Sequence, residues 1–112
     1  MLALMSIPLA HAQPPTSVLV EIHFLLGYVE GSGCEFNRNG TWYDSRAAQM
    51  HLRDKFNYLA AGNLTDTTEA FIENAATQSS LTGQAYTVRC AGGATMTSNR
   101  WLRDELARLR RY

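Results

Sequence analysis

Three short clusters hold the residues of this sequence that could do chemistry. They span residues 36–40, 51–55 and 79–86. Together they supply guanidinium, ammonium and imidazole groups, two adjacent serine hydroxyls, a side-chain amide and a phenol. Groups of these kinds, when brought to one place, are suited to binding a carboxylate, phosphate or sulfate.

The second cluster supplies a basic stripe. His51 and Lys55 lie four residues apart in a segment predicted to be helical, so they share one face, and Tyr58 continues that line by a turn. A ligand-binding site would form if the other two clusters packed against this face. Its candidate residues are Arg38, Asn39, His51, Lys55, Ser79, Ser80 and Tyr86.

A purely structural role for these residues is the competing interpretation. Arg38 would then pair with Asp44 or Glu35, and His51 would be a hydrogen-bonded residue at the margin of the core. The two serines would cap the entry to a strand. Such roles are the commoner use of these residue types, and the sequence leaves both interpretations open.

A hydrolase can be drawn from the same residues as an alternative function. Ser79 or Ser80 would be the nucleophile, His51 the base, and Asp44 or Asp54 the acid that orients the base. The sequence has no G-x-S-x-G motif, and a chain of 112 residues has little room for a substrate cleft. We therefore assign no catalytic residue and consider a binding or interaction module the better hypothesis.

The three clusters also resemble the signature of the YfeK-like family of small exported bacterial proteins, whose function is unknown. The family pattern runs F-x-R-N-G, then H-L-x-x-K, then S-S-x-[ST]-G-x-x-Y. It stands here at Phe36, Arg38, Asn39 and Gly40, at His51, Leu52 and Lys55, and at Ser79, Ser80, Thr82, Gly83 and Tyr86. The resemblance implies export and a compact mixed fold, and it implies no particular activity.

Four helices are predicted from apolar residues spaced three and four positions apart. Their approximate ranges are 17–31, 45–60, 66–78 and 98–109. We expect Thr16 or Ser17 to cap the first helix, and Thr65 or Asp66 to cap the third, with Glu69 completing a capping box. These helices would carry the second cluster and precede the third.

A small antiparallel sheet is predicted to position the first and third clusters. Strands are expected at residues 34–38, 41–43 and 85–90, and Asn39-Gly40 is a strong signal for a tight hairpin turn between the first two. The fold class is therefore α+β, with about four helices packed on a small antiparallel sheet.

The cysteine count indicates one disulfide. Cys34 and Cys90 are the two cysteines of the sequence, and they lie in two of the predicted strands. No C-x-x-C motif occurs, and neither His23 nor His51 forms a metal-ligand spacing with a cysteine. We expect a structural bridge between Cys34 and Cys90, no metal site and no cofactor.

The N-terminal residues have the pattern of a secretion signal. Residues 1–9 are apolar and are followed by Ala10-His11-Ala12, the small-x-small pattern that precedes signal-peptidase cleavage. The apolar segment is shorter than a typical signal, and no Lys or Arg precedes it. A start codon assigned too far downstream would explain both departures. We expect residues 1–12 to be a signal peptide and residues 13–112 to be one domain, periplasmic or secreted, with no membrane anchor after cleavage.

The net charge of the chain argues against one class of partner, nucleic acids. Ten basic and ten acidic residues give no net charge, so we expect no nucleic-acid partner. The C-terminal stretch is locally basic, which fits cations near the end of a helix better than a binding patch. The expected partner is an anionic small molecule or an envelope protein, and the sequence identifies neither.

Overall fold

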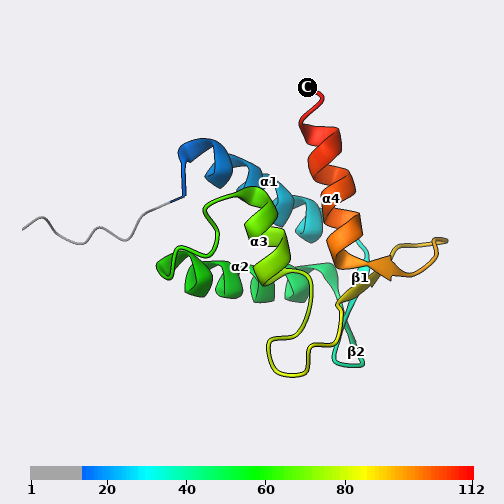
Figure 1. Ribbon diagram of the computed structural model, residues 1–112. Helices are drawn as coiled ribbons and strands as arrows, with labels where there is room; N and C mark the ends of the chain where they lie inside the picture. The colour runs from blue at the N-terminus through cyan, green and yellow to red at the C-terminus, as the bar shows by residue number, and fades with distance from the viewer. Residues whose placement is uncertain (1–13) are drawn as a thin grey trace, which may run out of the picture.

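The computed structural model describes residues 14–112, and the predicted signal peptide at residues 1–12 lies outside them (Figure 1). The predicted α+β fold is confirmed. The elements in chain order are α1 (Thr16–Gly31), β1 (Glu35–Arg38), β2 (Thr41–Tyr43), α2 (Ser45–Ala61), α3 (Thr68–Ala75), β3 (Thr87–Arg89), β4 (Met96–Thr97) and α4 (Ser98–Leu109). In residues 14–112 no helix is long and apolar enough to cross a membrane.

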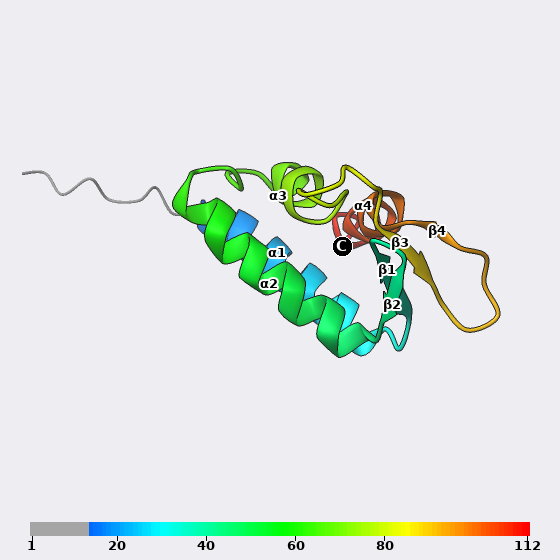
Figure 2. The ribbon, with the colours of Figure 1, turned by 90° about the horizontal axis from the view of Figure 1, so that it is seen from below.

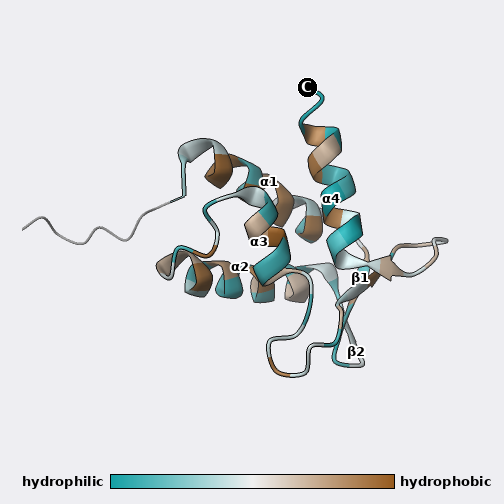
Figure 3. Ribbon diagram, viewed as in Figure 1, coloured by the Kyte–Doolittle hydropathy of each residue, from teal (hydrophilic) through white to brown (hydrophobic). Residues whose placement is uncertain are grey.

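The helices bury the apolar faces that the spacing predicts. α1 and α2 lie alongside each other, and in Figure 2 α3 and α4 lie above them and the sheet lies to their right. Ile22 and Leu25 of α1 are fully buried, and the rings of Phe56 and Phe71 pack edge to face with centroids 5.7 Å apart. Figure 3 shows hydrophobic and hydrophilic residues alternating along α4, as expected for a helix with one buried side.

The sheet has four antiparallel strands in the order β2-β1-β3-β4. Arg38 pairs with Thr41, so Asn39 and Gly40 form a two-residue loop, and both have positive φ, 52° and 85°. This is the backbone that Asn-Gly hairpin turns require, and it confirms the predicted turn. One face of the sheet carries Phe36 and Val88 into the core.

The predicted disulfide is confirmed. Cys34 and Cys90 are bonded, with Cα atoms 4.3 Å apart, directly beyond the last paired residues of β1 and β3. The bond links positions 56 residues apart in the sequence. In the chain-entropy account, a bridge of this span stabilises the folded chain by about 4 kcal/mol.

Two helix starts and one strand differ from the predictions. Pro15 precedes α1, which has no side-chain cap, and Thr67 caps α3 by accepting a hydrogen bond from the Ala70 amide at 3.0 Å. Glu69 therefore lies in the first turn of α3, one residue short of the capping-box position. The short strand β4 was not predicted, because two residues carry no periodicity and only pairing with β3 defines them.

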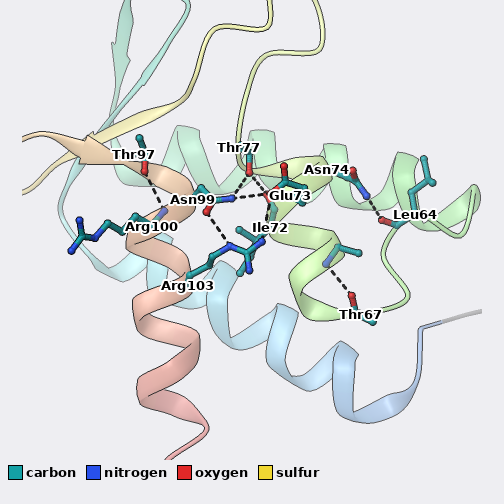
Figure 4. Close-up of polar contacts among 11 residues, drawn as sticks. Leu64, Thr67, Ile72, Glu73, Asn74, Thr77, Thr97, Asn99, Arg100 and Arg103 are labelled. Carbon is teal, nitrogen blue, oxygen red and sulfur yellow. Dashed lines mark hydrogen bonds and ion pairs between the residues drawn. The ribbon is translucent and has the colours of Figure 1, made fainter.

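Polar contacts join α3 to α4 (Figure 4). The Asn99 amide nitrogen donates to Thr77 Oγ1 at 2.8 Å and to Glu73 Oε2 at 3.2 Å. Asn99 Oδ1 in turn accepts from Arg103 Nε at 3.0 Å. These contacts hold the start of α4 against the end of α3.

Candidate functional site

All seven residues predicted to form a site line a single shallow groove. The groove has a volume of about 380 Å³ and lies between α2, the β1–β2 turn and the loop of residues 78–86. In Figure 1 this loop and the turn extend on the same side of the molecule, below α2. The lining residues are Arg38, Asn39, Thr41, Tyr43, His51, Lys55, Ser79, Ser80, Leu81 and Tyr86.

α2 contributes the basic stripe. His51 and Lys55 face the same way and both reach the Tyr86 hydroxyl, with Nε2 and Nζ at 3.4 Å and 3.2 Å from the phenol oxygen. Lys55 Nζ also donates to the Gln78 carbonyl oxygen at 3.1 Å. Tyr58 does not extend the stripe into the groove, because its side chain is 80% exposed and outside the lining.

Arg38 enters the groove from the end of β1. Its Nη1 lies 2.5 Å from His51 Nδ1, and its guanidinium carbon lies 4.7 Å from the centroid of the Tyr43 ring. The carboxylates considered as its structural partners are engaged elsewhere. Asp44 caps α2 through the Ala47 amide, and Glu35 pairs with Arg89 on the opposite face of the sheet.

His51 is held as a neutral imidazole. Burial lowers the pKa of His51 below its usual 6.5, the charges of Arg38 and Lys55 lower it further, and Asp54 opposes them. The neutral ring then accepts from Arg38 at Nδ1 and donates its Nε2 proton to Tyr86. Because the Tyr86 oxygen accepts from both His51 and Lys55, its own proton can be donated to a third group.

Asn39 and Ser79 fasten the loop to the hairpin turn. Asn39 donates to Ser79 Oγ at 3.2 Å and accepts from Thr82 Oγ1 at 2.7 Å. Ser79 Oγ also accepts from the amides of Leu81 and Thr82, and its side chain is 4% exposed. The structural interpretation therefore holds for Ser79, which shapes the loop, whereas Ser80 is exposed at the groove.

The groove is positive and has no acidic wall. None of its lining residues is Asp or Glu. Within residues 14–112, neither Arg38 nor Lys55 forms an ion pair, since both use their hydrogen-bond donors on neutral groups. Two cations therefore face the groove without an ion-pair partner among the described residues.

The geometry does not favour a Ser/His hydrolase. Both ring nitrogens of His51 are engaged, one by Arg38 and the other by Tyr86, and in the described chain neither Ser79 nor Ser80 bonds to the ring. A nucleophile and its base need that contact. No group of three His, Cys, Asp or Glu residues in the described part of the chain could hold a metal ion.

The sequence interpretation missed Tyr43, which lies beneath Arg38 and lines the groove. A signal for it was present. The two-residue Asn39-Gly40 turn fixes Arg38 opposite Thr41, and strand alternation then places Tyr43 on the same face as Arg38. The role of the Gln78 carbonyl could not be predicted, because every residue has one.

Comparisons with known proteins place the chain in a family. A family model described as "Family of unknown function (DUF5329)" matches residues 16–110, which span all four helices and all four strands. The curated proteins and the solved structures gave no match. The match includes every residue of the groove and covers most of the chain, which therefore belongs to the DUF5329 family of unknown function.

Proposed function

We propose that this chain is an exported binding module whose groove takes a small anion. Arg38 and Lys55 supply the positive charge, and Tyr86 and Ser80 supply hydroxyl donors beside them. A carboxylate, phosphate or sulfate group is the chemistry that such donors recognise. The observation that carries the proposal is the convergence of two cations without carboxylate partners on one groove.

The neutral state of His51 supports the same proposal. Its lone pair binds Arg38 Nη1, which holds one edge of the guanidinium and leaves the other donors of Arg38 for a ligand. The ring of Tyr43 holds the flat side of the same group. An arginine fixed in this way loses little side-chain entropy when an anion binds.

Anion binding can be measured by isothermal titration calorimetry with sulfate and phosphate. We expect Arg38→Gln and Lys55→Met each to weaken binding at least about tenfold, the effect of losing one charge-assisted hydrogen bond. Arg53→Gln is the matched control, because Arg53 is an exposed cation of the same helix outside the groove. It should leave the dissociation constant unchanged.

The result that contradicts the proposal is equally specific. If sulfate and phosphate fail to bind the wild-type protein, or if Arg53→Gln weakens binding as much as Arg38→Gln, the groove is not an anion site. Circular dichroism of each variant would show that the loss of binding is not a loss of folding.

Export and membership of the YfeK-like group belong to the same proposal. Export is supported by Ala10-His11-Ala12 and by the Cys34–Cys90 bond, since disulfides persist in oxidising compartments. The YfeK-like resemblance rests on the motifs at residues 36–40, 51–55 and 79–86. Expressed in a Gram-negative bacterium, the protein should be recovered from the periplasm or medium with Gln13 as its first residue. A chain that stays in the cytoplasm with its thiols reduced would contradict this placement.

A further inference from the structure

A second hollow adjoins the groove and is apolar. It has a volume of about 40 Å³. Its walls are formed mainly by Phe36, Ala48, Leu52, Ala76 and Leu102, and the polar lining residues that it does not share with the groove are Asn37 and Ser98. We call this hollow the apolar pocket.

The apolar pocket and the groove share one wall. Arg38, Tyr43, His51 and Tyr86 line both of them. Lys55 lines the groove and is absent from the lining of the apolar pocket. A ligand that entered the apolar pocket would therefore meet one cation, Arg38, in the shared wall, and would meet Lys55 only in the groove.

The size of the apolar pocket limits what can fill it. A volume of this measure holds about three water-sized groups, at roughly 10–15 Å³ for each. Its polar lining residues are largely engaged elsewhere: Arg38 and Tyr86 both bond to His51, and Asn37 accepts a hydrogen bond from the Gly40 amide at 3.1 Å. Carbon groups of a ligand suit such walls better than water, which needs two or more polar partners.

We propose that the anion bound at Arg38 is the carboxylate of a short aliphatic acid, with its tail in the apolar pocket. This inference rests on the proposed anion site and names the ligand class that it takes. The planar carboxylate matches the guanidinium donors that His51 and Tyr43 leave available. The tail has up to about three carbon atoms, the number of water-sized groups that the pocket volume can hold.

The test is a chain-length series of straight-chain acids titrated into the wild-type protein by calorimetry. From acetate to butyrate, affinity should rise about fourfold for each added carbon, the effect of burying one methylene group. It should level off or fall at hexanoate and octanoate, because the pocket is then full. Equal affinity for acetate and butyrate would overturn the inference.

A filled pocket provides the second arm. Ala48→Val adds carbon atoms to a wall of the apolar pocket, and it should remove the preference of butyrate over acetate while acetate binds as before. Ala61→Val, an exposed alanine at the end of the same helix, is the matched control and should keep the preference. A preference that survives Ala48→Val in a folded protein would place the tail elsewhere and overturn the inference.

The outcomes separate this inference from the proposed function. Binding of acetate and sulfate that depends on Arg38, without any effect of chain length, would retain the anion site and reject the aliphatic tail. Absence of binding by every anion tested would reject both. If Ala48→Val does not fold, the wild-type series alone still decides.

Discussion

Positive charge gathers in two regions of this chain, in the groove and in helix α4 with the two residues that follow it, whose arginines we call the α4 arginines. The two regions use this charge differently. Four of the five arginines between residues 100 and 111 form ion pairs. In the groove, Arg38 and Lys55 donate only to neutral groups within the described chain. The region with more basic residues is therefore the one with less uncompensated charge.

The partners of the α4 arginines come from other helices as well as from α4. Arg110 binds both oxygens of Glu21 in α1, at 2.9 Å and 3.0 Å, and Glu69 in α3 at 2.5 Å. Arg103 reaches Glu73 of α3 at 3.5 Å, and Arg108 pairs with the buried Glu105. These arginines tie α4 to the rest of the fold.

The difference between the regions shows how to interpret basic residues in a sequence. A run of arginines produces a positive electrostatic potential only where no carboxylate pairs with it. The carboxylates that pair with the α4 arginines lie up to 89 positions away in the sequence. Two scattered cations facing a groove without acidic residues are better placed to attract an anion.

Removal of the disulfide should have the largest effect on the free energy of unfolding. We expect Cys34→Ala with Cys90→Ala to lower the free energy of unfolding by about 4 kcal/mol, measured with urea. The bond holds β3 to β1, whose Arg38 lines the groove, whereas α4 also packs against α1 and α3. Chemical reduction of the wild type should give the same loss, and a loss below about 1 kcal/mol would contradict the role assigned to the bond.

Arg110 tests the structural use of charge. Arg110→Met should lower the free energy of unfolding by about 1–2 kcal/mol, because it leaves Glu21 and Glu69 without their shared cation. Arg100→Gln is the control. Its ion pair with Asp104 is 3.9 Å long and exposed, so the loss should stay below about 0.5 kcal/mol. Neither variant should change sulfate affinity, and a change would show that the α4 arginines contribute to the site.

The two regions should also respond to different ranges of pH. The pKa of His51 is lowered from 6.5 by burial and by Arg38 and Lys55, so the unfolded chain takes up that proton first. Stability without ligand should therefore fall as pH drops below about 6.5. The pKa of Glu21 is lowered from 4.5, chiefly by the hydrogen bond from Arg110, so its contribution is kept above pH 4.5 and lost below it.

Urea unfolding across pH 3–8 would measure both windows. His51→Gln should abolish the loss of stability below about pH 6.5 and keep the loss below pH 4.5 that Glu21 causes. Protonation of His51 ends its hydrogen bond from Arg38 but adds a third positive charge beside the groove. A bound anion favours that charge and so raises the pKa of His51, and we therefore expect sulfate affinity to increase as pH falls from 7 to 5. Sulfate affinity that is constant over this range in the wild type would separate His51 from the site.

The sequence by itself determined the features that depend on neighbours along the chain. The Asn39-Gly40 turn follows from the tolerance of both residues for positive φ, and the shared face of His51 and Lys55 follows from their helical spacing. The disulfide followed from the presence of two cysteines in predicted strands. The turn and the shared helix face depend on residues that are close in the sequence, and two cysteines allow only one intramolecular pairing. All three features can therefore be predicted without coordinates.

Tertiary structure alone decided what depends on distant partners. It paired Glu35 with Arg89 and left Arg38 without a carboxylate partner among the described residues. It also opened an apolar pocket whose walls come from β1, α2 and α4 and from Ala76, just after α3. Neutralisation of a charge and the size of a cavity are set by atoms that meet only on folding, and residue types along the chain do not specify them.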